Sequence, residues 1–176
     1  MSGTNSTIEC LKSRRSVKSY KPDMLPKEVL QEIVEAGTWV PTGMNRQSPI
    51  ILAITDKKVR DQLSRMNAQI MGAKGDPFYG APVVLVVLAD KSVGTYVYDG
   101  SLVMGNMMLA AKALDLGSIW IHRAKEEFEL PEYKQLLKEL GVEGEWEGIG
   151  HCAVGYADGE LPKAAPRKDK RVFWVE

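Results

Sequence analysis

Three cations and one hydroxyl lie within five residues near the start of the chain, in the sequence Arg14-Arg15-Ser16-Val17-Lys18. A guanidinium group presents N–H donors in a planar fork, and a hydroxyl adds a donor that carries no charge. Together these groups suit a phosphate monoester better than a single lysine would. The cluster therefore indicates an anion-binding site, although a short basic run is also typical of a solvated protein face.

The composition restricts the partners of such a site. The 176 residues include 23 Lys and Arg and 23 Asp and Glu, so the formal net charge is zero. No net field then attracts nucleic acid or an anionic membrane, and we expect neither as a partner. The longest uncharged run, residues 77–89, is too short to span a bilayer, and no basic segment leads into an apolar run at the start. We expect a soluble, cytoplasmic protein.

Metal and nucleophilic chemistry have few candidates in this sequence. The cysteines, Cys10 and Cys152, are far apart, and His122 and His151 are the only histidines. This pattern predicts neither a disulfide framework nor a metal site. The sequence contains no serine nucleophile elbow, no Walker loop and no GxGxxG motif. We therefore assign no catalytic side chain and expect the chemistry to belong to a bound cofactor.

Helices and short apolar strands must position the basic cluster. Apolar periodicity and helix breakers predict helices over 8–12, 26–37, 57–70, 96–114 and 131–140. Apolar runs predict strands over 50–54, 83–88, 118–121 and 148–156. Residues 72–80 are rich in Gly and predict a mobile insert. This mixture predicts one α+β domain over residues 1–176, with helices and strands in layers.

Two apolar segments are expected to meet another surface. Residues 96–114 are apolar nearly all round and carry several small residues, so this helix should be buried in a large core or against another subunit. The final segment, 157–176, ends in Val172-Phe173-Trp174-Val175, which is too apolar for a free tail. We expect the tail to dock on a second subunit.

Four segments follow one another in a recognisable order. They are Arg14 to Tyr20, the loop Pro41 to Gln47, the unit Asp99…Asn106 to Ala111 followed by Leu116-Gly117-Ser118, and Gly155-Tyr156 with Pro162 and Arg167-Lys168. In this order and spacing they resemble the nitroreductase family of FMN-dependent oxidoreductases. The resemblance implies a nitroreductase-like three-layer α+β fold, with a mixed central sheet flanked by helices. It also implies a homodimer with two FMN molecules at the subunit interface.

The resemblance further implies which residues bind FMN. Arg14, Ser16 and Arg167 would hold the phosphate, with Lys168 as a further contact. Lys18 would lie near the N1/O2 edge of the flavin, where a cation stabilises the reduced, anionic ring. The other cofactor-binding residues implied are Arg15, Pro41, Thr42, Asn45, Gln47, Asn67, Ile121, His122 and Arg123.

These remaining residues would contribute in three ways. The amides of Asn45 and Gln47 would form hydrogen bonds with the pyrimidine edge or the ribityl chain of FMN. The alternative is that these residues are polar only because they lie in a loop. Asn67 would contribute an amide to the flavin of the other subunit. Main-chain N–H groups at His122 and Arg123 would lie beside flavin O4 and N5, and His122 is otherwise a strand-end histidine.

The implied activity is hydride transfer from NADH or NADPH to FMN, followed by reduction of a small acceptor such as a nitroaromatic or a quinone, in a ping-pong reaction. Two alternatives stay open. In the first, the chain binds flavin without turnover, as a carrier or sensor. In the second, it is a specialist that reduces a ring or cleaves a carbon–halogen bond. The short insert 71–76 lacks the Glu/Tyr/Lys set with which some relatives hold iodinated tyrosines, which argues against deiodination.

Overall fold

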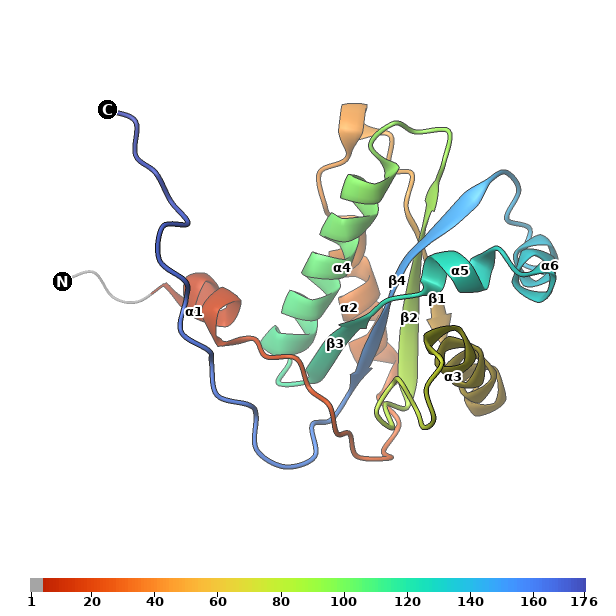
Figure 1. Cartoon of the computed structure of the whole chain (residues 1–176), viewed down its shortest axis with the longest axis horizontal. Coiled ribbons are helices and arrows are strands. Elements are labelled where there is room, and N and C mark those ends of the chain that lie inside the picture. Colours follow the sequence, from red (N-terminus) through yellow and green to blue (C-terminus); the bar gives the residue numbers. More distant parts are fainter. Residues whose placement is uncertain (1–4) are drawn as a thin grey trace.

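A computed structural model describes residues 5–176 (Figure 1). Its sheet has four strands in the order β1-β2-β4-β3. The strands are β1 Ile50–Ile54, β2 Val83–Asp90, β3 Gly117–Ile121 and β4 Trp146–Gly155. We expected a mixed sheet, and this is wrong for the four strands, because all three pairs are antiparallel. The parallel pairing found within residues 5–176 is one isolated bridge, Ser16 with Ser118.

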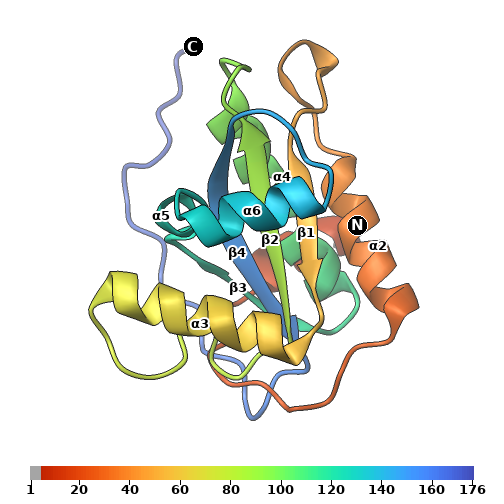
Figure 2. The ribbon, with the colours of Figure 1, turned by 90° about the vertical axis from the view of Figure 1, so that its right-hand side faces the viewer.

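Helices cover both faces of the sheet, so the three-layer prediction is confirmed (Figure 2). The helices are α1 Ser6–Ser13, α2 Lys27–Thr38, α3 Lys57–Met71, α4 Tyr96–Ala113, α5 Ala124–Phe128 and α6 Pro131–Glu139. One face carries α2 and α4, and the other carries α3, α5 and α6. Successive residues of β2 face opposite layers, because Leu85 belongs to the core with Ile33 and Met107, whereas Val86 belongs to the core with Leu63.

The second half of the predicted mobile insert 72–80, residues 76–80, is anchored. Phe78 is fully buried. The Asp76 carboxylate accepts hydrogen bonds from Arg60, from Ser64 and from the backbone N–H groups of Phe78 and Gly80. Burial raises the pKa of Asp76, but these hydrogen bonds outweigh it, so the pKa lies below its usual value. Residues 76–80 are thus tied to α3.

Replacing Asp76 with Ala is expected to lower the free energy of unfolding by about 2–4 kcal/mol, because it removes the carboxylate that pairs with Nη2 of the buried Arg60 and accepts from Ser64 and two backbone N–H groups. Urea unfolding at pH 7 measures this loss. The folded-state pKa of Asp76 is depressed, so its contribution is complete above about pH 4 and is lost as the pH falls through the folded value. The difference in free energy of unfolding between the wild-type protein and Asp76→Ala should therefore become smaller in acid.

The matched control for this substitution is Asp61→Ala. Asp61 also contacts Arg60, at 3.1 Å, but its carboxylate accepts no hydrogen bond from Ser64 or from the backbone of residues 76–80. Equal destabilisation by the two substitutions would show that Asp76 has no special anchoring role.

One side of α4 faces outward in the single chain. Met104 and Met107 are buried, whereas Tyr98 and Leu102 are 73% and 46% exposed. Complete burial of this helix in a large core is therefore wrong, and burial against another subunit stays a prediction. The tail residues 172–175 are also exposed, so docking of the tail stays a prediction. Within residues 5–176, no helix combines the length and the apolar character needed to cross a membrane.

Candidate functional site

The basic segment follows α1 and runs along the outer edge of β3. The N–H of Val17 donates to the carbonyl of Ser118 at 3.1 Å, and the Val17 side chain is buried. Gly117 permits this contact, because a Cβ there would lie 2.8 Å from Val17 Cγ2. With Val17 directed inward, its neighbours Ser16 and Lys18 face solvent. The segment therefore presents a hydroxyl and an ammonium on one surface.

Arg14 and Arg15 have different surroundings although they are adjacent. Arg15 Nη1 donates to the carbonyls of Lys12 and Arg14, both at 2.8 Å, and so satisfies carbonyl groups at the end of α1. Arg14 Nη1 is buried and has no hydrogen-bond partner among residues 5–176. Buried donors are normally paired, so this one fits an anion that approaches the segment. Arg15 thus has a structural role at the end of α1, and cofactor binding by Arg15 stays a prediction.

The segment after β4 lies beside the basic segment. The N–H of Asp158 donates to the carbonyl of Ser19 at 3.0 Å. A cavity of about 460 Å³ lies between the two segments, and its lining includes Ser16, Lys18, Leu161 and Pro162. The structure thus brings the first and fourth motif segments together beside Gly117 and Ser118 of the third.

A neighbouring aromatic ring and the tail complete the surroundings of this cavity. Lys18 Nζ lies 6.0 Å from the centroid of the Tyr79 ring. Arg167 and Lys168 are exposed farther along the tail, and Arg167 donates to the carbonyl of Ala165 at 3.0 Å. No hydrogen bond or ion pair in the described part of the chain joins either residue to Arg14. One chain therefore does not assemble the whole expected phosphate clamp.

The polar loop 41–47 has a strained backbone. Left-handed φ angles occur at three of its residues that are not glycine, Met44, Asn45 and Gln47 (54°, 54° and 51°). Such conformations cost about 1–3 kcal/mol each and gather at functional sites. Thr42 Oγ1 accepts from the N–H of Gln47 at 3.0 Å, and Asp99 on α4 accepts from the N–H of Gly43 at 3.1 Å. These bonds hold the loop in its unusual form.

The side chains of this loop are available to a ligand. Pro41, Asn45 and Gln47 are exposed, and Thr42 is partly buried. Gln47 Nε2 donates to Asn45 Oδ1 at 3.2 Å, so the two amides hold each other and leave further donors and acceptors outward.

The basic segment and the polar loop lie at different ends of the sheet (Figure 1). The loop leads into Ile50, which pairs with Leu88 near the end of β2. Ser16 bridges to Ser118, which the register aligns through β4 with Val83 at the start of β2. Five residues of strand correspond to about 17 Å. One chain therefore does not close these two segments around each other.

The third candidate segment is the exit from β3. Ile121 is buried, His122 is exposed, and Arg123 has a left-handed φ of 77°. Asn67, which is fully buried, donates through Nδ2 to the carbonyl of His122 and accepts through Oδ1 from Arg123 Nε, both at 2.9 Å. The amide of Asn67 is thus used inside the chain. Its expected contact with the flavin of another subunit stays a prediction.

Sequence reasoning missed two further residues near this exit. Glu127 and His151 are both fully buried, with Glu127 Oε2 at 2.6 Å from His151 Nε2. Neither residue lies in a motif, and they are distant in the sequence. For His151 the remaining signal was a polar residue within the apolar run that forms β4, whereas Glu127 gave no signal because α5 is too short to show a pattern.

Residues 11–156 match the model of the nitroreductase family. The chain belongs to this family. It is 26% identical over 117 residues to a relative from Methanothermobacter thermautotrophicus, which covers 64% of this chain and 59% of that protein. It is also 26% identical over 168 residues to the FMN reductase [NAD(P)H] of Bacillus subtilis, which covers 78% of this chain and 65% of that one. The chain thus spans less than two thirds of these relatives.

A solved structure agrees over the whole length. The nitroreductase with bound FMN from Bacteroides fragilis has a TM-score of 0.89 and 27% identity, and the match covers 98% of this chain and 100% of that one. The fold described above is therefore a nitroreductase fold.

Proposed function

We propose that this chain is an FMN-dependent oxidoreductase that uses NADH or NADPH to reduce a small acceptor, such as a nitroaromatic or a quinone, in a ping-pong reaction. The observation that carries this proposal is the buried Nη1 of Arg14, which has no partner within residues 5–176, next to the exposed Ser16 and Lys18 in a chain of the nitroreductase family. The bound FMN of the Bacteroides fragilis structure and the name of the Bacillus subtilis FMN reductase support it.

The residues present fit this cofactor. Arg14 and Ser16 supply a charged and a neutral donor for a dianionic phosphate. Lys18 places a cation where a developing negative charge on the ring would be stabilised. FMN supplies the redox chemistry when bound, by accepting a hydride and passing electrons on. The task of the chain is then to bind, orient and shield, and no side chain is required as an acid or a base.

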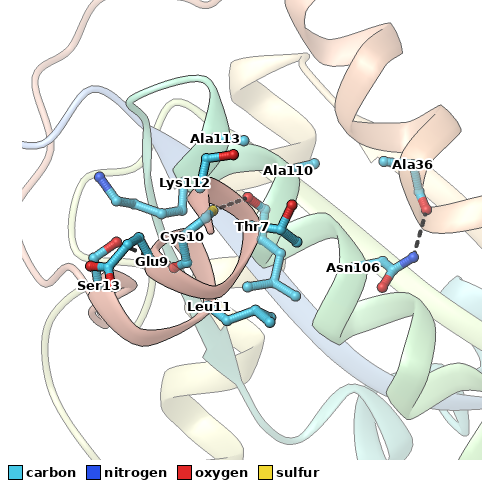
Figure 3. Close-up of a pocket in the computed structure, with 12 residues that line it drawn as sticks. Thr7, Glu9, Cys10, Leu11, Ser13, Ala36, Asn106, Ala110, Lys112 and Ala113 are labelled. Atoms are coloured by element: carbon cyan, nitrogen blue, oxygen red, sulfur yellow. Dashed lines mark hydrogen bonds between the residues drawn. The ribbon is translucent and has the colours of Figure 1, made fainter. Parts of the chain in front are cut away.

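We further propose that two copies of the chain share each site. This proposal rests on the separation of the basic segment from loop 41–47 and on the outward face of α4. A groove of about 630 Å³ between α1 and α4 continues this face, and its lining includes Cys10, Leu11, Leu109 and Ala110 (Figure 3). A second copy seated there would bury the groove. Docking of the tail would bring Arg167 and Lys168 to the phosphate.

An anaerobic titration tests the activity and separates the alternatives. Protein loaded with FMN is titrated with NADH or NADPH, and a series of oxidants is then added. Bleaching by a nicotinamide and reoxidation by several acceptors is the expected result. A carrier or sensor would bind FMN without bleaching, and a specialist would be reoxidised by one acceptor. Protein that stays colourless with added FMN would disprove the proposal.

Mixed dimers test the shared site. Arg14→Ala is combined with the double variant Asn45→Ala/Gln47→Ala, and dimers that contain one copy of each are isolated with two different tags. If each site draws on both copies, one of the two sites is then free of substitutions, so about half of the FMN capacity should return. Equilibrium dialysis with FMN measures this capacity.

The control for this experiment combines Arg14→Ala with Ser16→Ala, which lie in the same segment and leave no intact site. A site built within one chain predicts no recovery in either mixture.

A further inference from the structure

We propose that Asn67, Glu127 and His151 form a buried positioning unit that fixes the backbone of residues 121–124. The inference rests on the proposed function and on the family resemblance, which implies that the main chain at His122 and Arg123 lies beside flavin O4 and N5. None of the three residues reaches the surface. Their role is to act through the backbone that they hold.

The backbone at Arg123 requires such support. Its φ of 77° lies in the left-handed region, which residues with a Cβ rarely adopt. Arg123 also precedes the first residue of α5 and makes no side-chain cap to that helix. Unfavourable conformations of this kind persist where surrounding contacts determine them. The contacts of Arg123 therefore identify what holds the loop.

Asn67 bonds the main-chain carbonyl of His122 and the side chain of Arg123, the two residues that flank one peptide bond. Its Nδ2 donates to the His122 carbonyl and its Oδ1 accepts from the Arg123 side chain, each at 2.9 Å. A single buried amide thus fixes the direction of the carbonyl and the path of the next side chain. Rotation of this peptide would break the first bond and strain the second.

Glu127 and His151 hold Asn67 and the preceding residue. Glu127 Oε2 accepts from Asn67 Nδ2 at 3.4 Å and lies 2.6 Å from His151 Nε2. The last contact has the distance of an ion pair without the geometry of a linear hydrogen bond. His151 Nδ1 lies 3.4 Å from the Ile121 carbonyl. The unit therefore reaches three consecutive residues, 121, 122 and 123.

The sheet fixes the fourth residue of this backbone. A Cβ at Gly148 would lie 2.2 Å from the carbonyl oxygen of Ala124, so only glycine allows β4 to approach this closely. Leaving a buried polar group unpaired costs free energy. Moving one member of the unit would leave its partners unpaired, so the contacts hold one another in place. The exit from β3 is thus rigid for a segment without regular secondary structure.

Hydrogen exchange tests the positioning role without flavin. The N–H of Glu127 donates to the carbonyl of Arg123 at 3.0 Å, so its exchange reports on the loop. Asn67→Leu removes all three hydrogen bonds of the amide at similar volume, and exchange at Glu127 should become about tenfold faster while β2 keeps its protection. The control is Gln69→Ala, at an exposed position of α3. Unchanged exchange in Asn67→Leu overturns the proposal.

A pair of substitutions at Arg123 supplies a second test, which also serves if Asn67→Leu does not fold. Glycine adopts the left-handed conformation freely, whereas alanine does not. Exchange at Glu127 should therefore be about tenfold faster in Arg123→Ala than in Arg123→Gly, and Arg123→Gly should partly reverse the effect of Asn67→Leu. Equal behaviour of the Ala and Gly variants overturns the proposal.

The flavin spectrum and reduction potential then link the loop to the cofactor. Both should shift in Asn67→Leu and return toward wild type in Asn67→Leu/Arg123→Gly, because glycine restores the backbone and not the lost amide. Faster exchange without a flavin shift would show that the unit positions a loop that the cofactor does not meet. Wild-type protein that binds no FMN would disprove the proposed function, while the exchange results would still decide the positioning role.

Discussion

Replacing Arg14 with Ala is expected to weaken FMN binding about ten- to a hundredfold. The reason is the loss of a charged donor to the phosphate, which contributes about 1.5–3 kcal/mol. The buried Nη1 that has no partner among residues 5–176 is the donor that this prediction concerns. Titration of the apoprotein with FMN, followed by quenching of FMN fluorescence, gives the dissociation constant.

Arg15→Ala is the matched control for Arg14→Ala. Both substitutions remove one guanidinium from adjacent positions, so they change the charge of the segment equally. The Arg15 guanidinium bonds the carbonyls of Lys12 and Arg14, and we expect its loss to lower thermal stability more than FMN affinity. If Arg15→Ala weakens FMN binding as much as Arg14→Ala, general attraction by the basic segment explains the binding.

Replacing Lys18 with Met is expected to lower the reduction potential of bound FMN by about 30 mV, which equals about 1.4 kcal/mol for a two-electron couple. A cation beside the ring stabilises the anionic reduced form more than the neutral oxidised form. Met keeps the length and the apolar stem of Lys18, so FMN affinity should change less than in Arg14→Ala. Equilibration with reference dyes of known potential measures the shift.

Lys21→Met provides the control for Lys18→Met. Lys21 is an exposed cation of the same chain segment, and it lies beyond the buried Tyr20. Its removal changes the net charge by the same amount but should leave the potential close to that of wild type. Equal loosening of FMN by Arg14→Ala and Lys18→Met, with no change in potential, would contradict the division of roles between these residues.

Local signals predicted most of the fold. The apolar run 50–54 became β1 with the same bounds, and Asp56 caps α3 by accepting from the N–H of Val59 at 2.9 Å. Two short elements escaped prediction, the 3₁₀ turn Gly43–Asn45 and α5, because each is too short to show periodicity. The anchoring of residues 76–80 was also not predicted, because it depends on Arg60, which lies near the start of α3 and far from Asp76 in the sequence.

The candidate site was predictable as a set of motifs and less so residue by residue. Arg14 and Arg15 are the same residue type, and only the geometry at the end of α1 shows that Arg15 caps the helix whereas Arg14 Nη1 finds no partner in the described part of the chain. The resemblance implied a flavin contact for Asn67, and its contacts with His122 and Arg123 were not visible in the sequence because those residues lie far along the chain. The motifs, whose residues lie close together in the sequence, were therefore predictable. The roles that depend on contacts between distant residues were not.

The two edges of the sheet differ in their exposure to other polypeptides. The basic segment covers part of the β3 edge through the pairing of Ser16 with Ser118, whereas β1 pairs with β2 alone among the named strands. A free strand edge is a template on which an unrelated or misfolded chain can add. β1 has five residues, so an added strand would gain few backbone hydrogen bonds. The shortness of β1 thus limits aggregation at the edge that the described chain leaves open.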